Sequence, residues 1–209
     1  MHEISILRYF AATMRSLLKQ GLKGRKIILA SKSPRRQELL RGLEIDFEIR
    51  VKEVDESFDP SLQGAEVARF LAQVKASAFL SSLQEDEILI TSDTTVCLGD
   101  EILNKPADRD EAISMLSKLS GQTHSVVSAV ALTSEAKQVL FHDETSVHFR
   151  ELTLEEIEHY VDHYRPFDKA GSYGIQDFIG FIGIDKMNGS YYTVMGLPLH
   201  LLYQELSNF

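Results

Sequence analysis

The sequence has only one cysteine, Cys97, and it lacks any long hydrophobic run. A single cysteine excludes an internal disulfide and a cysteine-based zinc cluster, and it favours a reducing, cytoplasmic setting. No apolar stretch approaches the roughly 18 residues that a membrane-spanning helix needs, so we expect no membrane partner. The composition is 44% hydrophobic and 25% charged, which is typical of a globular chain and excludes a disordered or fibrous protein.

Several common nucleotide-binding and catalytic motifs are also absent. There is no G-x-x-x-x-G-K-[ST] phosphate loop, no G-x-G-x-x-G after a strand and no G-x-S-x-G nucleophile elbow, although composition alone leaves a Ser–His–Asp hydrolase open. His159 and His163 are four residues apart on an expected helix, a spacing that would allow metal ligation. Their many acidic neighbours are more typical of a solvated helix face, which is the interpretation we favour.

Charge is distributed unevenly along the chain. The net charge is −9, yet residues 15–41 contain nine basic side chains and one acidic one, so the rest of the chain sums to −17. An acidic body repels a nucleic acid, whereas a confined basic patch can hold a small anion by short-range contacts. The sequence therefore favours a small phosphorylated ligand over a nucleic-acid partner.

The chain divides into a short N-terminal segment and one larger domain. Residues 1–20 have the spacing of an amphipathic helix with a single acid, Glu3. This pattern leaves a transit peptide or a membrane-surface helix open, and it favours a docked terminal helix or a loosely attached extension. We therefore predict an N-terminal helical extension over residues 1–24 and one domain over residues 25–209.

Strands and helices alternate through the domain. Strands are expected at 27–30, 45–51, 87–92, 124–132 and 139–150, and helices at 34–41, 65–80, 108–120 and from Thr153 onward. The stretch 166–198 is rich in glycine and aromatic residues, which predicts short strands and tight loops before a closing helix that ends near Leu206. This order predicts an α/β domain with a mixed, twisted sheet flanked by helices.

The first strand-to-helix junction has the features of an anion site. Ser33 before Pro34 is a typical N-cap followed by proline in the first turn. Arg35 and Arg36 come directly after it, where their charge opposes the helix dipole at a cost of up to about 1 kcal/mol each. An anion bound at the helix N-terminus would offset that cost, and the guanidinium groups match phosphate geometry.

Acidic and basic residues elsewhere would complete such a site. Asp93 follows a buried strand, at the edge of an open α/β sheet where ligands bind. Together with Glu56 or Asp55, it would supply the carboxylates that Mg²⁺ prefers beside substrate phosphates. Lys75 and Lys105 would each present a cation to a phosphate chain.

Several blocks of sequence resemble the Maf family of nucleoside triphosphate pyrophosphatases over residues 26–207. These blocks are LASKSPRRQELL at 29–40, SDTTV at 92–96, NKP at 104–106, LSGQTH at 119–124, DKAGSYGIQ at 168–176, NGSY at 188–191 and GLPL at 196–199. The 168–176 block resembles the subgroup that acts on dTTP and UTP. Ser92 stands where the family usually has Ala, and Asp177 stands where Gly usually follows the glutamine.

The resemblance implies a fold, a reaction and a set of site residues. The fold would be Maf-like or inosine-triphosphatase-like, with a cleft at the strand ends. A nucleoside triphosphate would be cut between its α and β phosphates with Mg²⁺ or Mn²⁺, and the protein would be a homodimer. The implied catalytic residues are Asp93, Glu56, Lys105 and Lys75, with Asp93 and Glu56 also holding the metal, and the implied substrate-binding residues are Ser31, Arg35, Arg36 and Gln176.

Two other functions remain open at this stage. The family's association with inhibition of septum formation suggests a regulator that binds a nucleotide with little turnover. Such a regulator needs the same cations but no working carboxylate pair. A nucleic-acid-binding role through the basic stretch is disfavoured by the acidic remainder of the chain.

Overall fold

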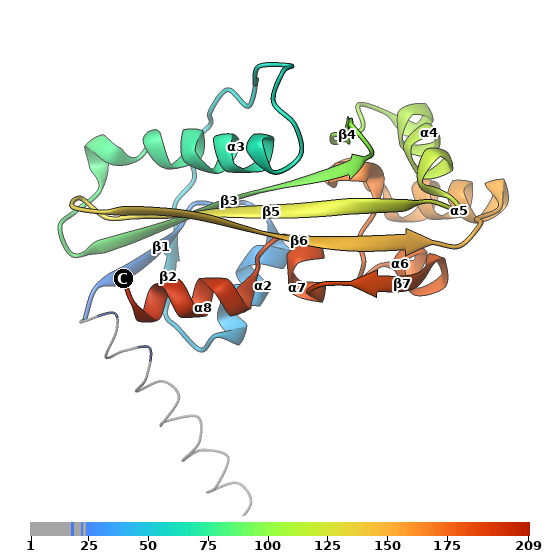
Figure 1. The fold of residues 1–209 in the computed structure, drawn as a ribbon. Helices are drawn as coiled ribbons and strands as arrows, with labels where there is room; N and C mark the ends of the chain where they lie inside the picture. Colours follow the sequence, from blue (N-terminus) through green and yellow to red (C-terminus); the bar gives the residue numbers. More distant parts are fainter. Residues whose placement is uncertain (1–17, 19–21, 23) are drawn as a thin grey trace, which may run out of the picture.

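The computed structural model describes residues 18, 22 and 24–209 (Figure 1). The helix expected over residues 1–20, and the 1–24 extension that contains it, therefore lie outside the described residues apart from three positions. Two of these, Leu18 and Leu22, are buried against the same core cluster as Leu202 and Leu206.

Within residues 24–209, seven strands and their helices follow one another in the order shown in Figure 1. The elements are β1 (Lys26–Leu29), α2 (Pro34–Gly42), β2 (Phe47–Ile49), α3 (Ala65–Ser77), η1 (Leu80–Ser82), β3 (Glu87–Leu98), β4 (Glu101–Leu103), α4 (Arg109–Leu119), β5 (Thr123–Thr133), β6 (Gln138–Phe149), α5 (Leu154–Tyr164), η2 (Ala170–Ser172), α6 (Phe178–Gly183), β7 (Ile184–Asn188), α7 (Tyr191–Val194) and α8 (Leu199–Ser207).

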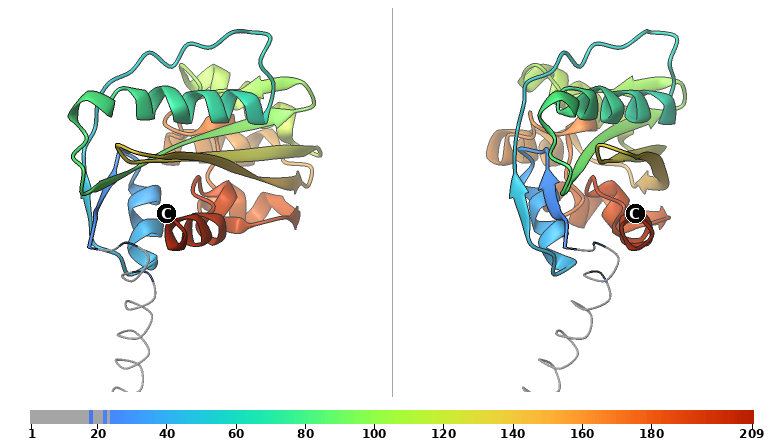
Figure 2. Two further views of the ribbon diagram at one scale, coloured as in Figure 1. Left: turned by 60° about the vertical axis from the view of Figure 1, so that its left-hand side comes forward. Right: turned by 90° about the vertical axis from the view of Figure 1, so that its left-hand side faces the viewer.

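The strands form one mixed sheet in the order β2-β1-β3-β5-β6-β7, with β4 paired to β3. β1 is parallel to both β2 and β3, and all other pairs are antiparallel. Helix α3 covers one face of the sheet, and α2 and α8 lie on the opposite side (Figure 2). The predicted α/β fold with a mixed sheet flanked by helices is confirmed. Among the described residues, no helix has the length and apolarity required to cross a membrane.

The predicted helix starts are confirmed in atomic detail. The Ser33 side chain accepts a hydrogen bond from the Arg36 backbone N–H at the start of α2. Asp108 caps α4 in the same way, and Thr153 forms a full capping box with Glu156 at the start of α5. Each cap satisfies backbone donors that the first helical turn leaves without partners.

The prediction that a strand ends at residue 92 is wrong. β3 continues to Leu98 because antiparallel β5 pairs with it from Leu89 as far as Cys97, opposite Ser125. β1 pairs with β3 only as far as Ile90. Asp93 therefore lies inside a strand rather than at its end, but beyond the point where the parallel neighbour stops.

Two other element boundaries differ from those expected. β2 contains three residues instead of the seven expected at 45–51, because it is an edge strand paired on one side only. The stretch 166–198 forms one strand and several short helices, whereas several short strands were expected. Glycines with positive φ, such as Gly171, Gly189 and Gly196, interrupt this stretch and keep its elements short.

His124, at the start of β5, should make folding stability sensitive to mild acid. The residue is 2% exposed, and burial lowers the pKa of His124 to about 4, with a smaller contribution from His148. A depressed folded-state pKa means that stability is full above the unfolded pKa of about 6.5 and is lost as the pH falls toward 4. We expect the free energy of unfolding to fall by about 2 kcal/mol between pH 7 and pH 5.

Urea unfolding at the two pH values measures this effect. His124→Gln should flatten the dependence, whereas substitution of the exposed His163 by Gln should leave it intact. An equally steep dependence in His124→Gln would assign the acid sensitivity to other groups.

Candidate active site

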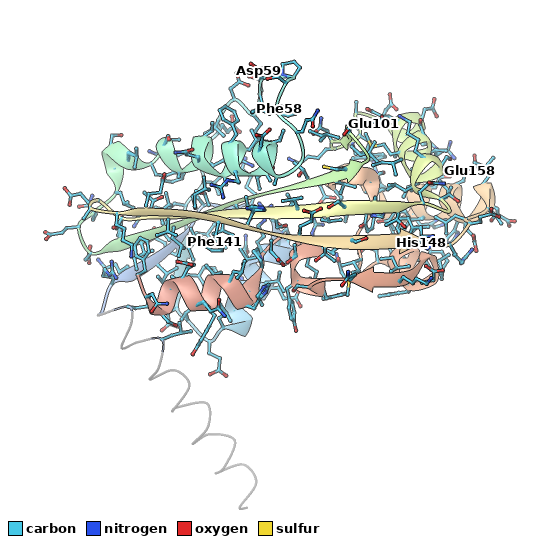
Figure 3. The ribbon with its side chains drawn as sticks, viewed as in Figure 1. Phe58, Asp59, Glu101, Phe141, His148 and Glu158 are labelled. Carbon is cyan, nitrogen blue, oxygen red and sulfur yellow. The ribbon has the colours of Figure 1, made fainter. Side chains whose placement is uncertain are left out.

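A cleft of about 710 Å³ opens beside β3, where β1 has ended. It is lined by the β1–α2 junction, the segment after β2, α3, β3 and two C-terminal loops. The segment between β2 and α3 has no regular secondary structure and rises beyond α3, with Phe58 and Asp59 at its outer part (Figure 3). The lining includes every site residue expected from the sequence: Ser31, Arg35, Arg36, Glu56, Lys75, Asp93, Lys105 and Gln176.

The N-terminus of α2 forms one wall of the cleft. Ser31 is buried, and its hydroxyl accepts a hydrogen bond from the Ser33 backbone N–H at 3.2 Å. Arg35 extends from the first turn of α2 and donates to Asp168 at 3.3 Å, with its side chain 23% exposed. Backbone N–H groups, the positive end of the helix dipole and a reachable guanidinium thus meet in one place, as an anion site requires.

Arg36 is held differently from its neighbour. Its Nε donates to the Gly196 carbonyl at 2.8 Å, its Nη1 to the Ser92 carbonyl at 2.8 Å and its Nη2 to Thr94 Oγ1 at 2.9 Å. Burial lowers the pKa of this guanidinium, and Asp93 opposes that effect. All three nitrogens therefore bind the protein itself, so Arg36 joins α2, β3 and the Gly196 loop. Phosphate binding would depend on its remaining N–H donors.

A cluster of two carboxylates and two lysines lies in the middle of the cleft. Lys75 Nζ lies 2.5 Å from Asp93 Oδ1 and 3.0 Å from Glu56 Oε1. Lys105 Nζ lies 3.5 Å from Glu56 Oε2. Burial raises the pKa of Glu56, but the Lys75 and Lys105 ammonium groups outweigh it and hold that pKa below its usual value. The cluster therefore keeps Glu56 anionic at neutral pH.

Glu56 and Asp55 differ in their position relative to the cleft. The Asp55 carboxylate accepts a hydrogen bond from the Ser57 backbone N–H, which forms a local turn. Asp55 is exposed and does not line the cleft. Glu56, one residue later, lines the cleft and contacts Lys75.

The chemistry of the donor set fits a hard divalent cation. Asp93 and Glu56 both lie within ion-pair distance of the same ammonium group, and Ser31 and Thr94 line the same cleft. Mg²⁺ is commonly bound by one or two carboxylates, with water and substrate phosphates completing its octahedron. Over the described part of the chain, no three His, Cys, Asp or Glu side chains group in a way that would hold a metal by themselves.

The two histidines on α5 belong to a different surface. The His159 and His163 rings stack with centroids 4.2 Å apart, and His163 Nδ1 contacts the His159 carbonyl. Neither residue lines the cleft. The interpretation of this pair as a solvated helix face agrees with that placement.

Sequence reasoning alone did not select Asp168, Lys169 or Asp177 as site residues. Asp168 contacts Arg35, and Lys169 Nζ lies 2.8 Å from Asp168 Oδ1 and 3.8 Å from Asp177 Oδ2. Burial raises the pKa of Asp168, but Lys169 and Arg35 lower it further than burial raises it. The signal available for Asp168 and Lys169 was the 168–176 block, in which the two residues are adjacent, and the signal for Asp177 was its departure from the family pattern.

The fold and the cleft together define a class: an α/β protein that holds a small polyanion with converging cations beside two carboxylates. A family model described as Maf-like protein matches residues 26–209. The chain belongs to this Maf family.

Similar proteins span nearly the whole chain. A protein of Flavobacterium psychrophilum named dTTP/UTP pyrophosphatase is 50% identical over 192 residues, which cover 92% of this chain and 98% of that protein. One of Parabacteroides distasonis with the same name is 49% identical over 191 residues, covering 91% and 99%. Among solved structures, a nucleoside-triphosphatase / dITP/XTP pyrophosphatase from Mycobacterium abscessus is 17% identical, covers 88% of this chain and 97% of its own, and has a TM-score of 0.45.

Proposed function

We propose that this protein hydrolyses nucleoside triphosphates between the α and β phosphates and releases a nucleoside monophosphate and pyrophosphate. Its substrates are dTTP and UTP, since relatives about half identical over nearly their whole length carry that name. Modified pyrimidine nucleotides of the same shape would also fit, which gives the enzyme a house-cleaning role in the nucleotide pool. The observation that carries the proposal is the convergence of Asp93, Glu56, Lys75, Lys105 and Arg35 in one cleft.

The cations make attack on a polyphosphate electrostatically feasible. A triphosphate carries several negative charges that repel both a carboxylate and an activated water. Arg35 at the α2 N-terminus, together with Lys75 and Lys105 across the cleft, would neutralise this charge as it shifts toward the leaving group. Preorganised contacts of this kind are worth about 3–4 kcal/mol each in the transition state.

A carboxylate in the cleft would accept the proton of the attacking water. The water oxygen bonds to the α-phosphorus, the bond from that phosphorus to the α–β bridging oxygen breaks, and its electron pair leaves with pyrophosphate. Asp93 is our candidate for the base because it is buried, rigidly placed on β3 and hydrogen-bonded to Lys75. Glu56 lies on an irregular segment, which suits a group that adjusts to the substrate.

Asp93 and Glu56 would also hold a divalent metal, Mg²⁺ or Mn²⁺. When bound, such a metal supplies charge stabilisation at the phosphates and polarises the α-phosphorus. Lys75, which now contacts both carboxylates, would then turn its ammonium group toward the phosphate chain.

The proposal also includes a cellular location and an oligomeric state. The protein acts in the cytoplasm, since its one cysteine is buried and unpaired, and since nucleotides are its substrates. It forms a homodimer, because α6 and α7 expose large apolar side chains, with Phe181 73% and Tyr192 47% exposed. Light scattering of the purified protein at micromolar concentration measures the assembly.

Pyrophosphate release from a panel of dTTP, UTP, CTP and 7-methyl-GTP, with and without Mg²⁺, tests the function. We expect metal-stimulated release of pyrophosphate, fastest with dTTP and UTP. Release of single phosphates would identify a phosphatase instead. Tight nucleotide binding without products would identify a regulator.

Arg35 and Arg36 should respond differently to truncation. Arg35→Ala removes a partly exposed cation, so kcat/KM should fall about tenfold to a hundredfold while the fold is retained. Arg36→Ala removes the guanidinium donors from the Ser92 and Gly196 carbonyls, and among the described residues only the Gly196 carbonyl keeps a side-chain donor, the Ser92 hydroxyl at 3.1 Å, so the free energy of unfolding should also fall, by about 2 kcal/mol. Initial rates and urea unfolding of both variants measure the two effects. Equal stability losses would contradict the distinction drawn between the two arginines.

A further inference from the structure

The Asp177 side chain, at the start of α6, forms a hydrogen bond with another helix instead of capping its own. Asp177 is the N-cap of α6, yet its side chain makes no cap hydrogen bond with that helix. An aspartate in this position ordinarily accepts from the first-turn backbone N–H groups. Instead, Asp177 Oδ2 accepts a hydrogen bond of 2.9 Å from the Tyr160 hydroxyl, which comes from α5.

Tyr160 also forms a hydrogen bond with Gly174, a residue that lines the cleft. Its side chain is fully buried, and its hydroxyl oxygen accepts a hydrogen bond from the Gly174 backbone N–H at 3.2 Å. Burial, reinforced by the nearby Asp177 carboxylate, raises the pKa of Tyr160, so the hydroxyl keeps its proton and remains a donor. One phenol group therefore links the first and last residues of the turn 174–177.

That turn carries Gln176. The Asp177 backbone N–H donates to the Gly174 carbonyl at 3.0 Å, which closes the turn from within. A Cβ at Gly174 would lie 2.5 Å from Asp177 Oδ2, so the close approach of the carboxylate needs a glycine there. Gln176 and Gly174 both line the cleft, and the buried Gln176 Oε1 finds no hydrogen-bond partner among the described residues.

We propose that Asp177, acting through Tyr160, is a positioning residue that fixes the Gln176 amide for contact with the nucleoside end of the substrate. The inference rests on the proposed function, and it assigns to Gln176, which lines the cleft, contact with the base or ribose. An amide oxygen that is buried without a partner has lost its hydration, and a donor from the ligand would restore a hydrogen bond. The benefit depends on the amide being held in place before the ligand arrives.

A series of ion pairs connects the Asp177 carboxylate with Arg35, at the end of the cleft proposed to bind phosphate. Lys169 Nζ lies 3.8 Å from Asp177 Oδ2 and 2.8 Å from Asp168, which in turn contacts Arg35. Loss of the Asp177 charge would therefore also disturb Lys169. Tyr160→Phe avoids this complication, because it removes only the hydroxyl and retains the ring that packs in the core.

The experiment compares two substrates, dTTP and methyl triphosphate, which has no base or sugar. In Tyr160→Phe and Asp177→Ala we expect KM for dTTP to rise about tenfold. The kcat/KM for methyl triphosphate should stay within about twofold in Tyr160→Phe. Asp177→Asn retains an acceptor for the Tyr160 hydroxyl and should rescue most of the loss in dTTP binding.

A mutant cycle separates positioning from a general structural role. In a Gln176→Ala background, adding Tyr160→Phe should have no further effect on KM for dTTP. The control Tyr164→Phe alters an exposed tyrosine one turn later on α5 and should change neither substrate's kinetics. Equal losses on both substrates, or a full effect of Tyr160→Phe without Gln176, would overturn the proposal.

The proposed function and this inference fail in different ways. A wild-type protein that releases no pyrophosphate from any nucleotide refutes the proposed function by itself. Calorimetric binding of dTTP and methyl triphosphate to the same variants then replaces the kinetic comparison. If the affinity for dTTP were unchanged in Tyr160→Phe, the positioning role would be refuted as well.

Discussion

Asp93→Asn should lower kcat at least about a hundredfold while the protein remains folded. Asparagine has nearly the same shape as aspartate and still accepts a hydrogen bond from Lys75, so the packing of β3 is retained. The amide cannot take the proton of a water molecule, and it is a poorer ligand for a divalent cation than a carboxylate. Single-turnover measurement of pyrophosphate release, with circular dichroism to verify the fold, measures the result.

A matched substitution elsewhere shows whether the loss is specific. Asp86→Asn alters an exposed carboxylate paired with Lys26 on the surface, and its kcat should equal that of the unaltered protein. If Asp93→Asn retained most of the turnover, Asp93 would be neither base nor metal ligand, and Glu56 would have to be tested in the same way.

Lys75→Met should lower both activity and stability. The substitution keeps much of the aliphatic stem but leaves Asp93 and Glu56 facing each other without the ammonium group between them. Breaking a largely buried ion pair by removing one partner costs about 3 kcal/mol or more, and kcat/KM should fall at least about a hundredfold because a phosphate-binding cation is lost as well. Urea unfolding and initial rates measure the two losses.

Stabilisation of Lys75→Met by Mg²⁺ tests the proposed cation site independently of catalytic turnover. If Asp93 and Glu56 form a cation site, millimolar Mg²⁺ should stabilise Lys75→Met more than the unaltered protein, because the metal replaces the missing charge. Lys118→Met, which alters a surface pair with Glu101, should show no such gain. Stabilisation that is equal in all three proteins would assign the effect to nonspecific ion binding.

Local sequence was sufficient to predict the starts of α2, α4 and α5 and several residues of the cleft, whereas Ser31 and Gln176 were expected only from the family resemblance. Ser33, Asp108 and Thr153 each cap a helix through contacts within three residues, so their signal is contained in a short stretch of chain. Arg35 and Asp93 were selected because of their positions next to a helix start and a buried strand. The cleft contains both of them.

The sequence alone could not predict contacts between segments that are far apart in the chain, including the pairing of strands in the sheet. The length of β3 is determined by its pairing with β5, and this pairing places Asp93 inside the strand. Arg36 binds Gly196, which is 160 positions away in the chain, so nothing near Arg36 distinguishes its role from that of Arg35. Asp177 was visible as a departure from the family pattern, but its contact with Tyr160 required the packing of α5 against the loop.

The contact between Arg36 and Gly196 also has a consequence for biosynthesis. The guanidinium is synthesised 160 residues before its carbonyl partner. A nascent chain that does not yet extend to Gly196 would therefore have an open, unfinished site, and the site would be completed only after Gly196 has been added.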